Sequence, residues 1–180
     1  MLGIIIGIAA VLVTVGIGSG SAASITERLE SRGTNLLTVS SGVRGQTATN
    51  KLTLADAETL SNAANFPNLK LVAPQYSSNA TLSNGASEGS YTVVGTTDAY
   101  PTVRSLTLEN GTFFSAEDVN QNASVVVLGA TVASDLFGGQ DPVDQTIRIN
   151  DALFRVVGVL ETSGSSGFGS SDSQVYIPIQ

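Results

Sequence analysis

One motif in the sequence is typical of a nucleophilic enzyme, the G-x-S-x-G pattern Gly85-Ala-Ser87-Glu-Gly89. The serine of this motif attacks a carbonyl carbon only from a strand-to-helix turn, with a histidine as its base. The chain contains no histidine, and the motif follows Asn84-Gly85, a strong hairpin-turn signal. We therefore interpret Ser87 as a turn residue and expect no catalytic residue and no enzyme activity in this domain.

The residue types also argue against a metal site. Cysteine and histidine are both absent, which removes thiolate and imidazole ligands. Three nearby aspartates, Asp135, Asp141 and Asp144, lack the alternate-position spacing of a calcium-binding loop. We expect no metal ion.

Two glycine-rich stretches resemble nucleotide-binding loops. Residues 164–169 (GSSGFG) have the composition of a phosphate loop, but no lysine follows them. Residues 18–23 (GSGSAA) match a dinucleotide fingerprint, but the apolar run before them is too long for a strand. No acidic residue lies between Glu30 and Asp56 to bind a ribose. We expect no bound cofactor.

The charge of the chain is acidic, with 15 Asp and Glu against 8 Lys and Arg, a net charge of −7. Nucleic acids and anionic lipid surfaces attract basic patches, so nucleic acid is not an expected partner. The scarcity of aromatic residues and the many Ser, Thr and Asn residues favour a β-rich exported domain.

The first 23 residues predict a membrane-spanning helix. No charged residue occurs before Glu27, and a span needs about 20 predominantly apolar residues. A cleaved signal peptide is the alternative, since residues 18–24 are small, but the basic segment that precedes such a peptide is missing. Gly3 and Gly7 have the spacing that lets helices pack closely in lipid, and we take them as candidate packing residues.

Residues 24–34 predict a stalk helix at the membrane exit. Ser24 and Glu27 have capping-box spacing, which would begin a new helix; alternatively, the membrane helix continues. Ile25 and Leu29 lie on one face of this helix, and we expect both to be packed.

Strands and helices alternate in the remainder, so the predicted fold class is α+β. Periodicity and turn signals place the strands and helices. The expected strands are 36–40, 69–73, 76–82, 91–95, 125–128, 146–149, 152–160 and 175–179. Strands 146–149 and 152–160 should form a hairpin around Asn150-Asp151, and the continuous apolar run 125–128 should be buried on both faces. One expected helix begins at Thr53 and ends near Phe66-Pro67, a short one covers 115–118, and a third covers 131–137; Thr53 with Asp56 and Ser115 with Asp118 mark the first two starts.

Taken in order, several segments resemble the MacB-type periplasmic core domain of ABC-transporter permeases, a family related to the FtsX-like permeases. The segments are LGIIIGIAAV (2–11), ITERLESRGTNLLTV (25–39), VVGTTD (93–98), ENGTFFSAED (109–118), VVVLG (125–129), LFGGQDPV (136–143), TIRI (146–149) and FRVVGVL (154–160). Two positions depart from the family pattern: Asp144 stands where glycine is usual, and Gly111-Thr112 where Gly-Arg is frequent.

The resemblance implies an architecture. Residues 1–23 would be the first permease helix, 24–34 a stalk, and 35–180 an extracytoplasmic core. The core would consist of a βαβ-type porter subdomain built from both ends and a sabre-like insert over roughly residues 96–150. Three further membrane helices are expected in the family, so we expect this chain to be part of a longer permease.

The resemblance also implies a function in the cell membrane, with the main domain outside the cytoplasm. ATP hydrolysis on a partner subunit or domain would move the membrane helices, and the stalk with Ile25 and Leu29 would pass this motion outward. A permease dimer and a periplasmic adaptor would be partners besides the lipid bilayer. The alternative is a membrane-anchored extracellular binding or adhesin-like module without a transport role; a pilin-like subunit would carry an earlier glutamate than Glu27.

Overall fold

A computed structural model describes residues 36–41, 52–62, 64, 66–163 and 170–179. The predicted membrane helix 1–23 with Gly3 and Gly7, and the predicted stalk 24–34 with Ile25 and Leu29, lie outside these described residues. Within the described residues, no helix has both the length and the apolar character that a membrane span requires. The chain divides into two compact units, Met1–Thr38 and Val39–Gln180, and all elements below belong to the second.

Helix α2 (Leu54–Ser61) begins where the sequence predicts. The Thr53 side chain accepts a hydrogen bond from the N–H of Asp56, and the Asp56 carboxylate accepts one from the N–H of Thr53 at 2.8 Å. The helix ends at Asn62, before the predicted end at Phe66-Pro67. The Asn62 side chain accepts a hydrogen bond from a backbone N–H two residues on (3.0 Å), and such local bonds compete with helix continuation.

Two predicted strands, 36–40 and 69–73, are wrong. Neither range has strand structure, and both expose apolar side chains, with Leu37 76% and Leu71 50% exposed. A strand exists only with a hydrogen-bonded neighbour, and no described residue supplies one to either segment.

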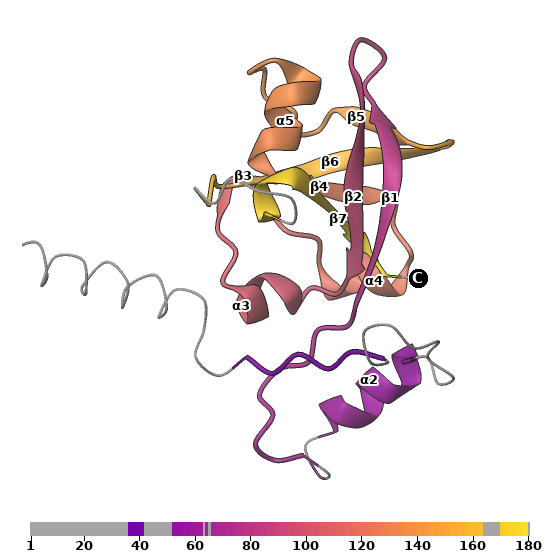
Figure 1. Ribbon diagram of the computed structural model, residues 1–180, viewed down its shortest axis with the longest axis vertical. Helices are drawn as coiled ribbons and strands as arrows, with labels where there is room; N and C mark the ends of the chain where they lie inside the picture. The colour runs from indigo at the N-terminus through magenta and orange to yellow at the C-terminus, as the bar shows by residue number, and fades with distance from the viewer. Residues whose placement is uncertain (1–35, 42–51, 63, 65, 164–169, 180) are drawn as a thin grey trace, which may run out of the picture. The chain divides into compact units, whose positions relative to one another are not determined.

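The described residues form a seven-stranded mixed sheet, which with the helices confirms a mixed α/β domain (Figure 1). The strands are β1 (Gln75–Ser83), β2 (Glu88–Thr96), β3 (Leu108–Gly111), β4 (Val125–Leu128), β5 (Thr146–Ile149), β6 (Ala152–Leu160) and β7 (Gln174–Pro178). Their order is β3-β6-β4-β7-β2-β1-β5, and β5 also pairs with β6. This second pairing closes the sheet into a ring, to which β3 is added along the C-terminal half of β6.

The sheet mixes both strand directions. The β2–β7 and β4–β6 pairs are parallel, and the other pairs are antiparallel. The two predicted hairpins, β1–β2 and β5–β6, are confirmed. Each is a local feature that a turn signal between two strand-like segments predicts.

Strand β4 lies between two apolar clusters. All four of its residues are buried, as its continuous apolar run predicts. Val126 and Leu128 belong to one cluster, which helix α5 (Ala130–Phe137) covers, and Val125 and Val127 belong to the other. The second cluster contains three buried aromatic side chains, Tyr100, Phe114 and Tyr176, and the first contains Phe137.

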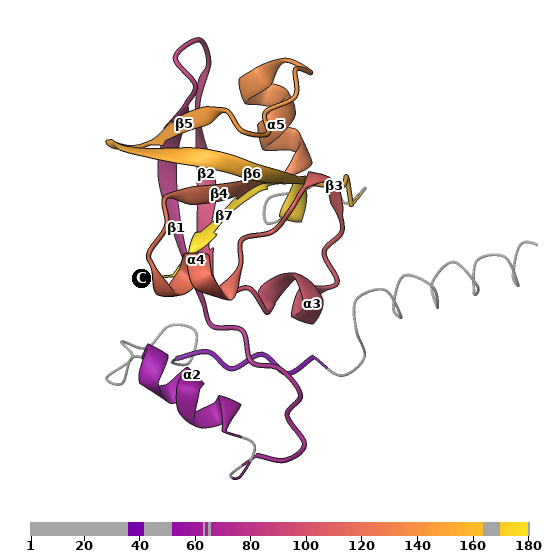
Figure 2. The same cartoon turned by 180° about the vertical axis from the view of Figure 1, so that it is seen from behind.

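Helix α5 and helix α4 (Ala116–Asn120) are confirmed, the latter with a capping box between Ser115 and Asp118. Three short elements were not predicted: α3 (Tyr100–Arg104), β3 and the 3-10 turn η1 (Ser171–Ser173). Each has five residues or fewer, too few for a periodic pattern, and none was placed by a capping box, a hairpin turn or a continuous apolar run, as α4, β5 and β4 were. Figures 1 and 2 show the sheet from both sides, with α5 near one end and α3 and α4 near the other.

Candidate functional site

The G-x-S-x-G motif lies in the β1–β2 turn, as predicted. The Asn84 side-chain oxygen accepts hydrogen bonds from the N–H groups of Ala86 and Ser87, each at 3.0 Å. Gly85 has a φ of 91°, which favours glycine. The amide nitrogen of Asn84 also donates to the backbone carbonyl of Leu136. The motif therefore builds a turn and attaches it to helix α5, and no helix follows the serine.

The three aspartates considered as metal ligands do not converge. Each has its own partner: Asp135 accepts from the Tyr91 hydroxyl (3.2 Å), Asp141 from Nδ2 of Asn110 (2.9 Å), and Asp144 pairs with the Arg155 guanidinium (3.1 Å). Across the described part of the chain, no three His, Cys, Asp or Glu side chains could hold a metal ion together.

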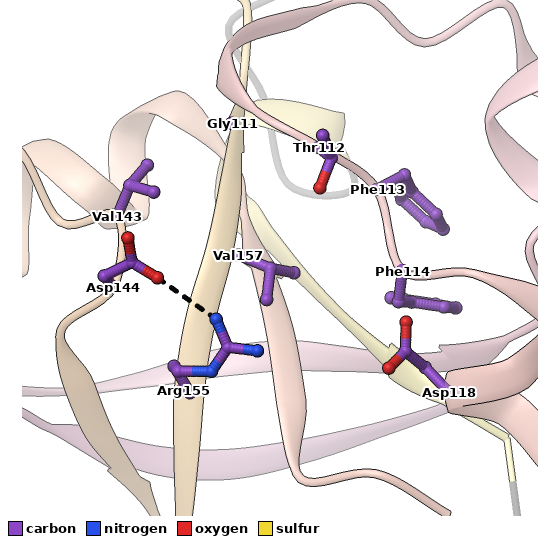
Figure 3. A pocket seen from close by; sticks show the side chains of 9 residues that line it. All are labelled: Gly111, Thr112, Phe113, Phe114, Asp118, Val143, Asp144, Arg155 and Val157. Atoms are coloured by element: carbon purple, nitrogen blue, oxygen red, sulfur yellow. Dashed lines mark hydrogen bonds and ion pairs between the residues drawn. The ribbon is translucent and has the colours of Figure 1, made fainter. Parts of the chain in front are cut away.

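An open pocket of about 320 Å³ lies among the described residues of this domain (Figure 3). The segment between β3 and α4, the turn before β5, and strand β6 form its walls. The lining residues are Gly111, Thr112, Phe113, Phe114, Asp118, Val143, Asp144, Arg155 and Val157. Apolar and charged side chains are mixed along the wall: Val143 lies beside Asp144, and Phe114 lies beside Asp118 (Figure 3).

Gly111 determines the shape of this pocket. Its φ is 76°, and a Cβ at this position would lie 2.2 Å from the carbonyl oxygen of Val157. Both the backbone conformation and the lack of space therefore require glycine. This allows β3 to approach β6, after which Thr112 donates its N–H to Val157 at 2.9 Å. The short polar sequence around Gly111 contains no signal for this contact.

The charged side chains of the pocket have hydrogen-bond or ion-pair partners within the domain. The backbone N–H and the hydroxyl of Ser115 donate to Asp118 at 2.8 and 2.7 Å. These hydrogen bonds, and to a smaller extent the Arg155 guanidinium, lower the pKa of Asp118 below its usual 3.8. The Arg155–Asp144 pair is largely solvated, with side chains 55% and 78% exposed. Such a pair is weak.

The lining residues therefore include no nucleophile with a base. The pocket combines phenylalanine and valine side chains with the Arg155–Asp144 ion pair and the Asp118 carboxylate.

A buried carboxylate was not predicted. Asp172 is 6% exposed and accepts a hydrogen bond from the N–H of Ser163 at 2.9 Å. Its own N–H is bonded to the Ser170 hydroxyl at 3.2 Å. The Asp172 carboxylate thus links the segment that follows β6 to turn η1, which precedes β7. Its role is structural, and the Ser-Ser-Asp spacing of a capped turn is the only sequence signal for it.

Comparison with known proteins gives a consistent family match. The model of the family described as the MacB-like periplasmic core domain matches residues 1–180. A macrolide export ATP-binding/permease protein MacB from Azoarcus sp. (strain BH72) is 36% identical over 182 residues, and one from Rhodospirillum rubrum is 37% identical over 185 residues. The alignments cover 99% of this chain but only 27% and 28% of those proteins.

Solved structures agree with this match. The crystal structure of the periplasmic region of MacB from Actinobacillus actinomycetemcomitans has a TM-score of 0.71 and 27% identity, over 86% of this chain and 70% of that one. The extracellular domain of the ABC-type transporter YknZ from Gram-positive bacteria shares the fold, with a TM-score of 0.62 and 20% identity over 77% of this chain and 70% of that one.

Proposed function

Because the chain belongs to the family of MacB-like periplasmic core domains, we propose that it forms the extracytoplasmic domain and first membrane helix of an ABC-transporter permease. The observation that carries this proposal is the family match over residues 1–180, with relatives named as macrolide export ATP-binding/permease proteins. ATP hydrolysis would take place on a separate subunit or domain, and macrolides are the first substrates to test.

In this proposal the domain acts mechanically. Residues 1–23 span the cell membrane, residues 24–34 form a stalk, and Ile25 and Leu29 pack the stalk against its surroundings. A helix that leaves the membrane and enters a packed domain can transmit a rigid-body motion. Such a role needs no catalytic side chain in the domain. A permease dimer, an ATP-binding subunit or domain and a periplasmic adaptor are the proposed partners.

The division of the core domain remains a prediction, and the sheet supports wider bounds for the insert. Strands β3, β4 and β5 come from the range 96–150, but each pairs with strands outside it. We therefore propose that the inserted part covers the whole sheet, residues 75–178. Limited proteolysis tests this: the first cuts should fall before residue 75, and early cuts near residues 96 and 150 would favour the narrower bounds.

A substitution in the stalk tests the proposed transport function directly. In the full-length permease with its ATPase, Leu29→Pro should stop transport and leave ATP hydrolysis largely intact, because a proline interrupts the stalk helix at a local cost of about 3 kcal/mol. Glu30→Gln is the matched control; it should leave transport unchanged, since an exposed helix charge contributes well under about 1 kcal/mol. Normal transport by Leu29→Pro at normal abundance would contradict the lever and favour an anchored binding module.

Retention of the membrane helix needs its own measurement. N-terminal sequencing of the protein extracted from membranes should find a start that lies before Ala22. A mature start near Ala22 or Ala23 would instead show that a signal peptide is removed.

A further inference from the structure

Among the described residues, strand β1 has no neighbouring strand along most of its outer edge. It pairs with β2 at every position from Gln75 to Ser83, but with β5 only at Leu82 and Ser83. Beyond that, Thr81 exchanges hydrogen bonds with Asn150, whose Oδ1 accepts from the Thr81 N–H (3.1 Å) and whose N–H donates to the Thr81 carbonyl (2.8 Å). In Figures 1 and 2 the β5–β6 hairpin meets β1 only near its C-terminal end.

The alternation of an antiparallel ladder shows which groups face this edge. Every second residue of a strand directs its N–H and C=O groups toward the same side. Because these groups of Thr81 point away from β2, those of Asn79, Ser77 and Gln75 must also do so. No described residue hydrogen-bonds to these outward N–H and C=O groups. Residues 75–80 therefore present about 20 Å of unpaired strand edge.

This edge lacks the features that usually protect an unpaired strand. Natural edges carry lysine, proline, inward charges or bulges. Residues 75–80 have the sequence QYSSNA, without charge or proline, and their pairing with β2 shows no register shift. The edge is therefore competent to pair with a further strand.

We propose that this edge pairs with the same edge of a second copy of this chain, antiparallel about a two-fold axis at Ser77. In this register Ser77 faces Ser77 of the partner subunit, and Gln75 faces Asn79 of the partner subunit. Outward groups then meet outward groups, and the three pairs exchange about six backbone hydrogen bonds. This pairing rests on the proposed function in one respect: both copies are anchored in the same membrane.

Charge supports a second copy as the occupant. The 180 residues carry a net charge of −7, so a contact between copies is disfavoured where unpaired carboxylates of the two copies meet. Residues 75–80 contain no ionisable acid or base other than the Tyr76 hydroxyl, so no like charges meet across the axis.

The exposed aromatic side chain on the edge also fits this pairing. Tyr76 is 69% exposed, although it lies on the same face of β1 as the fully buried Leu82. In the proposed register Tyr76 lies opposite Ser78 of the partner subunit and diagonal to Tyr76 of the partner subunit, a position that aromatic side chains reach. The contact is small, so anchoring in one membrane is needed to raise the local concentration of the two copies.

Cysteine crosslinking tests the register, because residues 1–180 contain no cysteine. The test uses the full-length protein in membranes, any cysteines elsewhere replaced by serine, and a short bis-maleimide. Ser77→Cys should crosslink to itself. Gln75→Cys and Asn79→Cys are placed on copies with different tags. The crosslink between the two variants should be at least tenfold stronger than the crosslink of either variant to another copy of itself. Ser134→Cys, exposed on α5, is the matched control.

Two variants test whether the backbone edge carries the contact. Ser77→Pro removes an outward N–H that β2 does not use, so it should abolish the Gln75–Asn79 crosslink at unchanged abundance. Ser77→Lys should do the same by placing two like charges opposite each other, and it serves if the proline variant folds poorly.

Equal crosslinking of Ser77→Cys and Ser134→Cys would overturn the proposal. It would also be overturned if Ser77→Cys reacted with a maleimide only after unfolding, since another segment would then cover the edge. The crosslink yield can be measured without any transport assay. If the Leu29→Pro protein transports normally and still forms the crosslink, the lever is refuted and the strand pairing remains supported.

Discussion

Two glycines at the ends of helix α5 allow one substitution to be compared in two environments. Gly129, at the N-terminus, has an ordinary φ of −70°, but a Cβ there would lie 2.4 Å from the backbone carbonyl oxygens of Ser171 and Asp172. Gly138, at the C-terminus, has a φ of 60° and no atom within 4 Å of the Cβ position. Alanine thus meets a steric obstacle at one end and a conformational one at the other.

The expected losses of unfolding free energy differ. At Gly129 the obstructing atoms belong to the backbone and cannot rotate away, so turn η1 must move and the 2.9 Å bond from the Gly129 N–H to the Gln174 carbonyl is disturbed. Overpacking of this kind costs about 1–3 kcal/mol, and we expect Gly129→Ala near 3 kcal/mol. At Gly138 the left-handed conformation costs about 1–2 kcal/mol, of which about half is offset because alanine restricts the unfolded chain.

Equilibrium urea unfolding of the purified protein, followed by tyrosine fluorescence and circular dichroism, measures both variants. Gly138→Asn is a further control and should cost less than Gly138→Ala, since asparagine tolerates the left-handed region. A loss for Gly129→Ala equal to or smaller than that for Gly138→Ala would refute the packing of η1 against the start of α5.

Three further predictions concern the core and the titrating groups. Leu128→Ala should lose about 2–5 kcal/mol, because its side chain is fully buried, whereas Leu153→Ala, 58% exposed, should lose under about 0.5 kcal/mol in the same urea titration. The folded-state pKa of Asp118 lies below 3.8, so its stabilisation is present above that pH and is lost as the pH falls through the folded value; Asp118→Asn should flatten the acid limb of a stability-against-pH curve. Burial raises the pKa of Tyr176 above 10.0, so its stabilisation is complete below that pH and is lost as the pH rises; Tyr176→Phe should move the alkaline unfolding midpoint upward, as tyrosinate absorbance would report.

Local signals predicted the elements that need only neighbouring residues. The capping boxes at Thr53 and Ser115 placed two helix starts, and the run of four buried residues in β4 was correctly expected between two apolar layers. Each of these features is determined within one element or one turn. The family resemblance, which rests on many segments in order, is confirmed by the match over residues 1–180.

Tertiary structure decided the features that depend on residues far apart in the chain. The second pairing of β5, with β6 as well as β1, closes the sheet, and neither strand's sequence specifies it. The strand-like segments 36–40 and 69–73 have no ladder partner among the described residues, while the polar β3 becomes a strand because Gly111 lets it approach β6. Sequence by itself determines the fold class, the hairpins and the family; hydrogen bonding between distant strands and the space beside a glycine exist only in the folded chain.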